Sequence, residues 1–491
     1  MAIASGICWG LSFAEHSSLL FSLAGLVPLF LLLSVPRAWL WGWIHGAVSW
    51  GVAMVWLVGT LTTYGQIQGW LAGLLLLAFA LVFGLYTLVF SAIGSRLWKR
   101  GGVLALLALP ALWVVIEIVR GFLITGFPWN LAAYAWIRMP GALPLAAWIG
   151  AWGVSALIVG AHAGLARGVT TKNLPLAVGT VLGTAFLLAL GARWGAASGG
   201  ERGAQASPPQ IVRTAALIQP DTPNQIAFDA ATFEADYARL LALTDEACRS
   251  GSLVLWPESA AWPMIYGRDA RLSADLARFT ARGCSILLNS VSQEGERYFN
   301  SALLVAPGQA VERYDKRHLV PFGEYVPLSR VFSFMASLAR NAGDFSPAAE
   351  LVLLDWSGEK LGPAICYEVV FPGEVAALTR AGATVLVSVT NDAWYGDTAA
   401  PWQHFAAARF RAAENRRWLL RAAITGVTAV VGPDGSLHGE LGVGARGALS
   451  ARFLGRTDLS PFVRAPWVVP SLCAALLLAA LVAVRRDRPP I

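Results

Sequence analysis

The stretch AICYEVVFPGE, residues 364–374, places a single thiol, Cys366, directly after an apolar run and two residues before Glu368. Open α/β sheets carry reactive side chains at the ends of their strands, so this position is a candidate for a nucleophile. A lone cysteine after an apolar strand is also a common buried structural residue. The stretch therefore predicts a strand that ends at Cys366, and chemistry there requires partners elsewhere in the chain.

Two further stretches contain residues that could be such partners. LVLWPES (253–259) ends its apolar run on Glu258, and RYDKRHLVPFGEYVP (313–327) carries Lys316 and Glu324. A thiol attacks as the thiolate, so it needs a base or a cation nearby. A carboxylate can take the proton, and a lysine can stabilise both the thiolate and the oxyanion of a tetrahedral intermediate. Each of these residues taken alone has another interpretation. Glu258 fits a turn or cap residue, and Lys316 fits a solvated surface residue.

Short β-type runs alternate with amphipathic helical stretches in the polar part of the chain. Strands are expected within 211–220, 253–259, 286–291 and 384–392, helices within 233–247, 269–282 and 402–417, and a hairpin with an Asp-Gly turn within 427–440. Such alternation over about 250 residues predicts one α/β domain with a substantial core.

The composition is too apolar for an ordinary soluble protein, because 56% of the residues are hydrophobic, only 14% are charged and the mean hydropathy is +0.56. A bilayer core of about 30 Å needs roughly 20 apolar residues as helix, and the sequence predicts about eight such spans. They are expected at 2–13, 17–35, 39–62, 70–95, 103–123, 143–166, 174–192 and 466–484. The expected domains are a seven-span bundle at 1–192, a linker at 193–208, the α/β domain at 209–457, and the last span with its tail at 458–491.

The basic residues between the expected spans are unevenly distributed. If the spans alternate, one set of loops holds Arg37, Arg96, Lys99, Arg100, Arg167, Lys172, Arg485, Arg486 and Arg488, and the other holds little beyond Arg120 and Arg138. Cytoplasmic loops are enriched in Arg and Lys, so both termini are expected in the cytoplasm and the α/β domain outside, in the periplasm of a Gram-negative cell. The same topology explains the net charge of +7 better than nucleic-acid binding does. The first span lacks a basic flank and a cleavage site, so we expect it to be retained.

The five cysteines show neither CxxC spacing nor a Cys/His metal pattern, so we expect no zinc site and no disulfide framework. Cys248 and Cys284 have no flanking acid, and both are interpreted as structural. Glu117 and Arg120 lie three residues apart on one face of the fifth expected span. A charged pair at membrane depth is either a substrate contact or an internally neutralised structural pair, and both interpretations stay open.

The motifs together resemble those of a known superfamily. WPES with Glu258, YDKRHLVPFGEYVP with Lys316 and AICYEVVFPGE with Cys366 are similar, in order and length, to the Glu, Lys and Cys motifs of the nitrilase (carbon-nitrogen hydrolase) superfamily. Within that superfamily, the chain resembles the apolipoprotein N-acyltransferases. This resemblance rests on the seven-plus-one spans and on four motifs: KRHLVPFGEYVP, TNDAWYG (390–396), PWQH (401–404) and GFPWN (126–130). The resemblance covers nearly the whole chain and implies a multi-pass helical membrane bundle joined to a nitrilase-like α-β-β-α sandwich.

The resemblance implies a two-step acyl transfer with no cofactor and no metal. Glu258 would deprotonate Cys366, which would attack the sn-1 ester of a phospholipid, with phosphatidylethanolamine as the expected donor. The thioester would then pass its acyl chain to the α-amino group of a diacylglyceryl-modified N-terminal cysteine on an apolipoprotein. Lys316 and the backbone N–H of Tyr367 would hold the oxyanion in both steps.

Further residues are implied to support this chemistry. Glu324 resembles an accessory carboxylate that orients the lysine or assists proton transfer. Tyr367 and Glu368 match positions that shape the pocket, and Glu368 is equally a partner for the lysine. Family members often carry Trp in the loop after the first strand, where this chain has Phe228. The apolar segment 331–339 is expected to be either a mobile lid that dips into the membrane or an ordinary core helix.

Two other functions compete with this interpretation. A membrane-tethered amidase or nitrilase would use the same Glu, Lys and Cys with water as the acceptor, although a small soluble amide would not require eight spans. A transporter or receptor would show inverted repeats or several charged spans, and only Glu117 and Arg120 are found. His404 could be a general base, but with Glu258 available a packing role is favoured. Nothing in the sequence demands more than a monomer.

Overall fold

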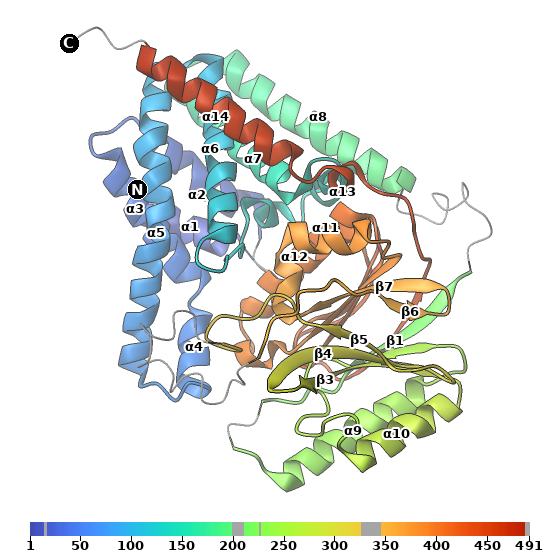
Figure 1. Ribbon diagram of the computed structural model, residues 1–491. Helices are drawn as coiled ribbons and strands as arrows, with labels where there is room; N and C mark the ends of the chain where they lie inside the picture. Colours follow the sequence, from blue (N-terminus) through green and yellow to red (C-terminus); the bar gives the residue numbers. More distant parts are fainter. Residues whose placement is uncertain (14–16, 199–210, 225–226, 326–344, 487–491) are drawn as a thin grey trace. The chain divides into compact units, whose positions relative to one another are not determined.

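The computed structural model describes residues 1–13, 17–198, 211–224, 227–325 and 345–486. The chain divides into two compact units. The first comprises Met1–Ser198, Trp402–Phe410 and Ser460–Ile491, and the second comprises Gly199–Pro401 and Arg411–Leu459. The described part of the first unit is helical, and the strands described all belong to the second unit (Figure 1).

The first unit is a bundle of apolar helices. Its helices are α1 (Ala2–Leu11), α2 (Leu19–Leu32), α3 (Ala38–Ala53), α4 (Trp56–Thr63), α5 (Gly69–Arg100), α6 (Gly102–Phe122), the short 3-10 helix η2 (Ala132–Trp136), α7 (Ala142–Thr170), α8 (Leu174–Ser198), α13 (Pro461–Arg464) and α14 (Val468–Arg486). Four of them, α5 to α8, are long and apolar enough to cross a membrane, and α3 with α4 forms a fifth candidate that bends by 53°. The apolar helices α1, α2 and Val468–Val484 are shorter, so the predicted count of eight spans stays a prediction.

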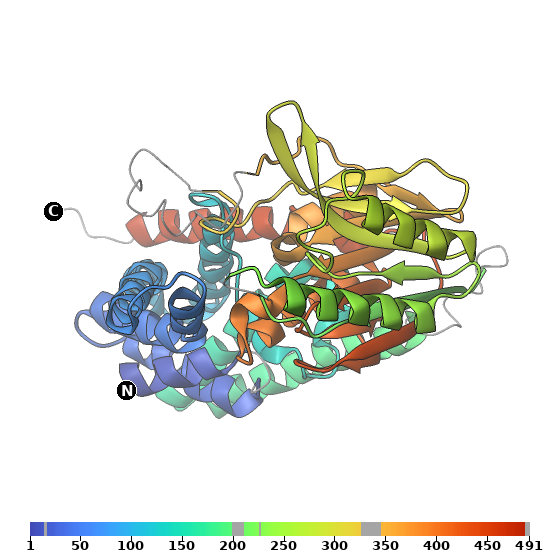
Figure 2. The same ribbon diagram turned by 90° about the horizontal axis from the view of Figure 1, so that it is seen from below.

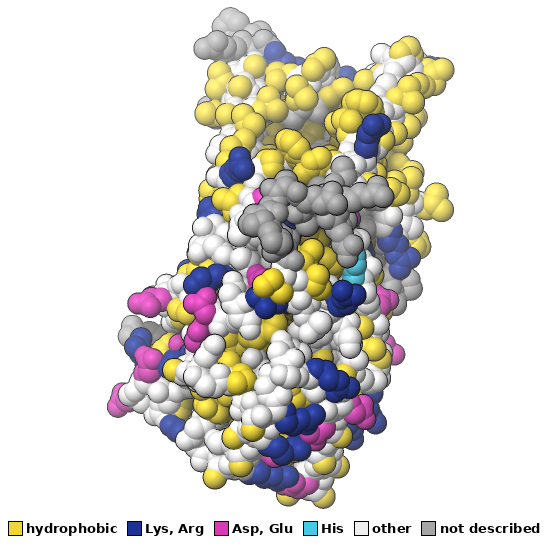
Figure 3. All heavy atoms as spheres, turned by 90° about the vertical axis from the view of Figure 1, so that its right-hand side faces the viewer, with side chains coloured by type: hydrophobic (Ala, Val, Ile, Leu, Met, Phe, Trp, Pro, Cys, Tyr) yellow, Lys and Arg dark blue, Asp and Glu magenta, His cyan; other side chains and the backbone are white. Residues whose placement is uncertain are grey.

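Small residues let these helices approach closely. A Cβ atom on Gly6 of α1 would lie 2.6 Å from the carbonyl oxygen of His45 in α3, and one on Gly46 would lie 2.5 Å from the hydroxyl oxygen of Thr87 in α5. Close approach through small residues is how helices associate in lipid, where burial of apolar surface gives little drive. In Figure 3, hydrophobic side chains crowd over the helices of this unit, whereas Lys, Arg, Asp and Glu gather over the second unit.

The second unit contains two six-stranded sheets. The first has the order β12-β1-β2-β3-β4-β5, with β1 (Arg213–Gln219), β2 (Leu253–Leu255), β3 (Ser285–Glu294), β4 (Arg297–Val305), β5 (Glu312–Asp315) and β12 (Gly447–Phe453). The second has the order β11-β10-β9-β8-β7-β6, with β6 (Leu354–Trp356), β7 (Glu359–Ile365), β8 (Val385–Thr390), β9 (Leu419–Ala423), β10 (Thr428–Val431) and β11 (Leu437–Leu441). The strands β1, β2 and β3 pair in parallel, as do β7, β8 and β9. Parallel pairing brings the carboxyl ends of these strands to one edge of each sheet.

Helices cover the outer faces of the two sheets. The helices α9 (Ala230–Ala247) and α10 (Ala270–Ala281) lie on the first sheet, and α11 (Pro372–Arg380) contacts β7 of the second (Figures 1 and 2). The helix α12 (Ala400–Asn415) follows β8, and its residues from Arg411 onward belong to this unit. The layers form the predicted α-β-β-α sandwich.

The sequence explains how the first helical layer forms. The side chains of Asp229 and Asp269 accept hydrogen bonds from the third residue of α9 and of α10, which is the usual N-cap arrangement. Apolar residues of both helices then pack with Trp256 and the strand residues beneath them in one buried core. This core holds β2 in place, and the residues that follow β2 lead to Glu258.

Two expectations differ from the structure or fall outside it. The prediction of no disulfide framework was wrong, because Cys248 and Cys284 form a disulfide with their Cα atoms 5.8 Å apart. The two cysteines meet because α9 ends beside the start of β3, a tertiary contact that a separation of 36 residues does not reveal. The segment 331–339, expected to be a lid or a core helix, lies outside the described residues.

Candidate active site

Three strand ends of the second unit bring the predicted site residues together. Glu258 lies three residues after β2, Lys316 directly follows β5, and Cys366 directly follows β7. The Nζ atom of Lys316 lies 3.7 Å from Oε1 of Glu258. Lys316 is 1% exposed and Glu258 6% exposed, so both side chains are buried and the lysine is not the solvated surface residue that it could have been.

A second carboxylate holds the lysine. Oε1 of Glu324 lies 2.9 Å from Nζ of Lys316, and its Oε2 accepts a hydrogen bond from the backbone N–H of Val320 at 2.7 Å. Burial lowers the pKa of Lys316, but the charges of Glu324 and then Glu258 outweigh that effect and raise its pKa above the usual value. The two carboxylates therefore favour the ammonium form of the lysine.

An asparagine that the sequence analysis did not single out connects the two carboxylates. Nδ2 of Asn300, in β4, donates to Oε1 of Glu258 at 2.9 Å and to Oε1 of Glu324 at 2.7 Å. Nδ2 of Asn289, in the adjacent strand β3, donates in turn to Oδ1 of Asn300 at 2.6 Å. The other oxygen of Glu258 accepts from the backbone N–H of Asn391 at 2.9 Å. Asn300 lies in an unremarkable strand sequence, FNSALL, so only the pairing of β3 with β4 identifies it.

Cys366 lies at a strained turn between β7 and the short 3-10 helix η5 (Cys366–Val370), with a φ angle of 52° and 6% exposure. Burial, followed by the charge of Glu258, raises the pKa of its thiol, whereas Lys316 and a hydrogen bond with the Thr390 side chain lower it. The raising effects are the larger, which favours the protonated thiol over the thiolate. Attack by this sulfur then requires that a neighbouring base accept the proton during the reaction.

Glu368 joins the turn at Cys366 to the loop that carries Lys316. Its carboxylate accepts hydrogen bonds from the backbone N–H groups of Ile365, Arg317 and His318 and from the hydroxyl of Tyr314, at 2.7 to 3.2 Å. Burial raises the pKa of Glu368 to about 7, against the lowering effects of these amides and of Lys316. These contacts give Glu368 a structural role. The family resemblance implied that Glu368 either shapes the pocket or is a partner for the lysine.

The remaining candidate residues pack against aromatic rings. The ring of Tyr367 packs edge-on against Phe371, with centroids 5.1 Å apart, and lies near His318. Phe228 is 63% exposed and is tilted against Phe233. His404 stacks on Trp129 within the first unit, with ring centroids 5.5 Å apart, in keeping with a packing role. Among the residues that the structure describes, no group of three or more His, Cys, Asp or Glu could hold a metal ion.

Comparisons with known proteins decide the family. Residues 5–164 match the apolipoprotein N-acyltransferase N-terminal domain, and residues 214–453 match the carbon-nitrogen hydrolase domain. The apolipoprotein N-acyltransferase of Geobacter metallireducens is 34% identical over 463 residues, which cover 89% of this chain and 86% of that protein. This chain belongs to the apolipoprotein N-acyltransferase family. The Azotobacter vinelandii member is 32% identical over 99% of this chain and 95% of its own length.

As an apolipoprotein N-acyltransferase family member, the protein is an acyltransferase with a membrane bundle and a nitrilase-like domain. A mutant of the Nesterenkonia AN1 amidase, of the nitrilase superfamily, is a similar solved structure. It is 23% identical, with a TM-score of 0.39, and the match covers 52% of this chain and 95% of the amidase.

Proposed function

We propose that this protein N-acylates the N-terminal diacylglyceryl-cysteine of apolipoproteins, with Glu258, Lys316 and Cys366 as catalytic residues. One observation carries the proposal: Lys316 and Glu258 lie 3.7 Å apart in a buried site, and the charges of both act on the thiol of Cys366. An acid, a fixed cation and a nucleophile are the groups that acyl transfer through a covalent intermediate needs. Family membership supplies the substrates.

The first half-reaction transfers an acyl chain to sulfur. Glu258 accepts the thiol proton while the sulfur of Cys366 bonds to the carbonyl carbon of the sn-1 ester of a phospholipid, with phosphatidylethanolamine as the proposed donor. The oxyanion of the tetrahedral intermediate is stabilised by the ammonium of Lys316 and by the backbone N–H of Tyr367. The carbon–oxygen bond then breaks, Glu258 returns the proton to the leaving alkoxide, and a lysophospholipid departs from the thioester.

The second half-reaction transfers the chain to nitrogen. The α-amino group of the diacylglyceryl-cysteine attacks the thioester carbon, and Glu258 accepts a proton from that nitrogen. The carbon–sulfur bond breaks, and the proton returns to the sulfur of Cys366. Glu324 acts by holding Lys316 in position, and Glu368 and Tyr367 shape the loop around the sulfur.

The proposed location is the bacterial inner membrane, with both termini in the cytoplasm and the catalytic domain in the periplasm. The disulfide between Cys248 and Cys284 supports an oxidising compartment for the domain, because cytosolic thiols are usually kept reduced. A site near the membrane also suits substrates whose acyl chains leave a bilayer at a cost of about 0.8 kcal/mol per CH₂. The protein is proposed to act as a monomer.

The deciding experiment incubates the purified protein with acyl-labelled phosphatidylethanolamine and a diacylated lipopeptide. Transfer of the label to the peptide amine is expected, and intact-mass measurement without the peptide should detect an acyl adduct on Cys366. Release of free fatty acid without transfer would instead identify a membrane-tethered hydrolase. A second arm with phosphatidylglycerol tests the proposed donor.

A further inference from the structure

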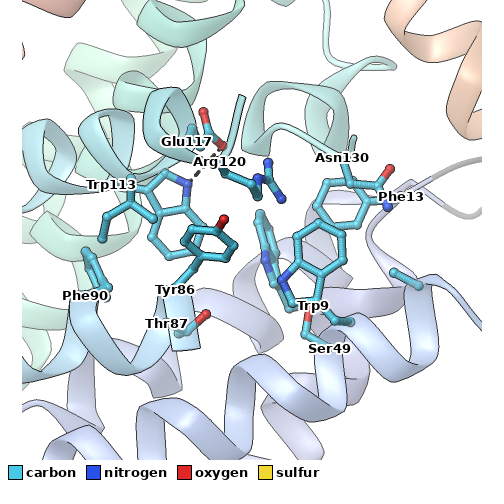
Figure 4. Close-up of a pocket in the computed structure, with 13 residues that line it drawn as sticks. Trp9, Phe13, Ser49, Tyr86, Thr87, Phe90, Trp113, Glu117, Arg120 and Asn130 are labelled. Atoms are coloured by element: carbon cyan, nitrogen blue, oxygen red, sulfur yellow. Dashed lines mark hydrogen bonds between the residues drawn. The ribbon is translucent and has the colours of Figure 1, made fainter. Parts of the chain in front are cut away.

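The proposed reaction leaves some buried charged groups without a role. One is Glu117 of α6, which lines a cavity of about 50 Å³ in the first unit together with Arg120 (Figure 4). Its Oε1 accepts hydrogen bonds from Nε1 of Trp113 at 3.0 Å and from the backbone N–H of Ala132 at 2.7 Å. The carboxylate also forms a hydrogen bond with the side chain of Ser155. These bonds join α6 to η2 and α7, which favours the structural interpretation of Glu117.

An ion pair between Asp392 and Arg421 lies in the second unit. Nη2 of Arg421 donates to Oδ2 of Asp392 at 2.8 Å, and both side chains are fully buried. The other guanidinium nitrogens donate to Oγ of Ser388 and to the backbone carbonyl of Val427, each at 3.2 Å. A buried ion pair is weak evidence for stability, so stability alone does not explain this one.

This ion pair belongs to the motif TNDAWYG (390–396), none of whose side chains has a role in the proposed reaction. The strand β8 ends at Thr390, the first residue of the motif. The next residue, Asn391, donates its backbone N–H to Glu258, and Asp392 comes directly after it. The motif therefore holds the proposed base through its backbone, and its side chains lie at the same strand end.

Thr390 connects the ion pair to the sulfur. The strands β7 and β8 pair in parallel, with Ile365 opposite Val389. The residues that come next on these two strands are Cys366 and Thr390, and the Thr390 side chain forms a hydrogen bond with the thiol. Oγ1 of Thr390 also donates to Oδ1 of Asp392 at 2.9 Å, and Thr390 is fully buried. One hydroxyl thus contacts both the nucleophile and a carboxylate.

The hydroxyl of Thr390 carries one hydrogen, so it can donate to only one of these partners at a time. While Cys366 is a thiol, the hydrogen goes to Asp392 and the hydroxyl oxygen can accept from S–H. A thiolate has no hydrogen and needs a donor, which the hydroxyl becomes when its hydrogen turns to the sulfur. Arg421 makes this turn less costly, because it keeps donating to Asp392 when the hydroxyl does not.

We propose that Thr390 is a further catalytic residue, which donates a hydrogen bond to the thiolate of Cys366. Asp392 and Arg421 hold its hydroxyl in place and are positioning residues. In the first half-reaction, the S–H proton passes to Glu258 as the hydroxyl turns to the sulfur. In the second, the electron pair of the breaking carbon–sulfur bond stays on sulfur, and the hydroxyl donates to it until the proton returns.

These two steps rest on the proposed function, but the hydrogen bond itself can be tested without substrate. The thiolate is the form of Cys366 that iodoacetamide alkylates, so the alkylation rate constant at a fixed pH reports how well the thiolate is stabilised. The full-length protein is alkylated in detergent, and mass spectrometry follows the peptide that contains Cys366. This separates its signal from those of Cys8 and Cys473, which are also free thiols.

Thr390→Val keeps the shape of the side chain and removes the hydroxyl, so we expect the alkylation rate constant to fall about ten-fold. Thr390→Ala, a second variant without the hydroxyl, should show the same loss. Thr390→Ser restores the hydroxyl and should bring the rate constant back to within about three-fold of the parent. An unchanged rate constant in both hydroxyl-free variants, or no recovery in Thr390→Ser, would overturn the proposal.

Thr428→Val is the matched control. Thr428 lies in β10 of the same sheet and is fully buried, and its hydroxyl accepts from the backbone N–H of Ala423 at 3.0 Å. This variant should be alkylated like the parent, and an equal loss here would show that any buried threonine has the same effect. Melting temperatures of all variants verify that they fold.

Arg421→Gln tests the positioning residues. It removes the charge that holds Asp392, and we expect the alkylation rate constant of Cys366 to fall about five-fold. Arg421→Lys keeps the charge and should restore most of that loss. Equal losses in the two variants would show that the charge of Arg421 does not position the hydroxyl.

Single-turnover measurements then connect the hydrogen bond to acyl transfer. Formation of the acyl adduct on Cys366 and transfer to the lipopeptide should both slow in Thr390→Val and recover in Thr390→Ser. Slower alkylation with normal acyl transfer would overturn the catalytic role of Thr390. If the parent protein forms no adduct while Thr390→Val still slows alkylation, the proposed function fails and the hydrogen bond to the thiolate stands.

Discussion

The Nζ atom of Lys316 lies 2.9 Å from Oε1 of Glu324, and Asn300 donates to that same oxygen. One carboxylate oxygen thus fixes both the lysine and the amide that also holds Glu258. Removing one member of a buried network of this kind leaves its partners unsatisfied, and the losses are therefore larger than one exposed ion pair implies.

Glu324→Gln tests the role of that carboxylate. The variant keeps an oxygen for Asn300 but loses the charge that helps to hold the lysine, so we expect kcat for acyl transfer to fall by about 10²-fold. Asp245→Asn, which removes an exposed pair with Arg278 and Arg282, is the control and should leave kcat unchanged. A wild-type kcat in the Glu324→Gln variant would show that the charge of Glu324 is not needed to hold Lys316.

Asn300 lies outside the three sequence motifs, and its hydrogen bonds predict that it positions the two carboxylates. Asn300→Leu removes the hydrogen bonds to Glu258 and Glu324 and leaves both buried acids short of a donor. We expect about 10²-fold lower kcat with a smaller change in KM, because Asn300 holds the two carboxylates in position. Steady-state kinetics with labelled phospholipid measure both constants. A change confined to KM would contradict a positioning role.

Cys366→Ser tests the nucleophile. The hydroxyl preserves the shape of the site but is a far weaker nucleophile than sulfur, so acyl transfer should fall by at least about 10³-fold and the acyl adduct should disappear from the intact mass. The melting temperature should stay within about 4 °C of wild type, since the change removes little buried surface. Residual transfer near the wild-type rate would exclude a thioester at this residue.

The disulfide predicts a stability effect of its own. Closing a loop of 36 residues between Cys248 and Cys284 stabilises the fold by about 4 kcal/mol through the entropy of the unfolded chain. The double variant Cys248→Ser, Cys284→Ser should therefore unfold at a lower denaturant concentration than wild type. Adding a reductant should shift wild type toward the variant and leave the variant unchanged. A wild-type protein that does not respond to reductant would show that the bond contributes nothing.

The raised pKa of Glu368 predicts how the free energy of unfolding depends on pH. Because its folded pKa is raised from 4.5 to about 7, the folded state holds this proton more tightly than the unfolded state between those values. The contribution of this group therefore makes the fold less stable as pH rises from 4.5 to 7, by up to about 3 kcal/mol in total. Glu368→Gln should flatten this slope of unfolding free energy against pH, although it also loses an acceptor for Ile365. An unchanged slope would refute the assignment.

The sequence predicted an α/β domain because its signals are local, and the family resemblance implied the sandwich. Alternating strand and helix patterns and the Asp-Gly turn between β10 and β11 can each be identified within a few residues. The sequence missed β4, which contains Asn300, and β5, which directly precedes Lys316.

The sequence alone determined which residue types follow the apolar strands: an acid at 258, a lysine at 316 and a thiol at 366. Tertiary structure decided what those residues contact. Asn300 joins two carboxylates only because β3 pairs with β4, and Cys248 meets Cys284 only because α9 ends beside β3. The physical reason is that sheet register and helix packing bring together residues whose separation along the chain carries no signal.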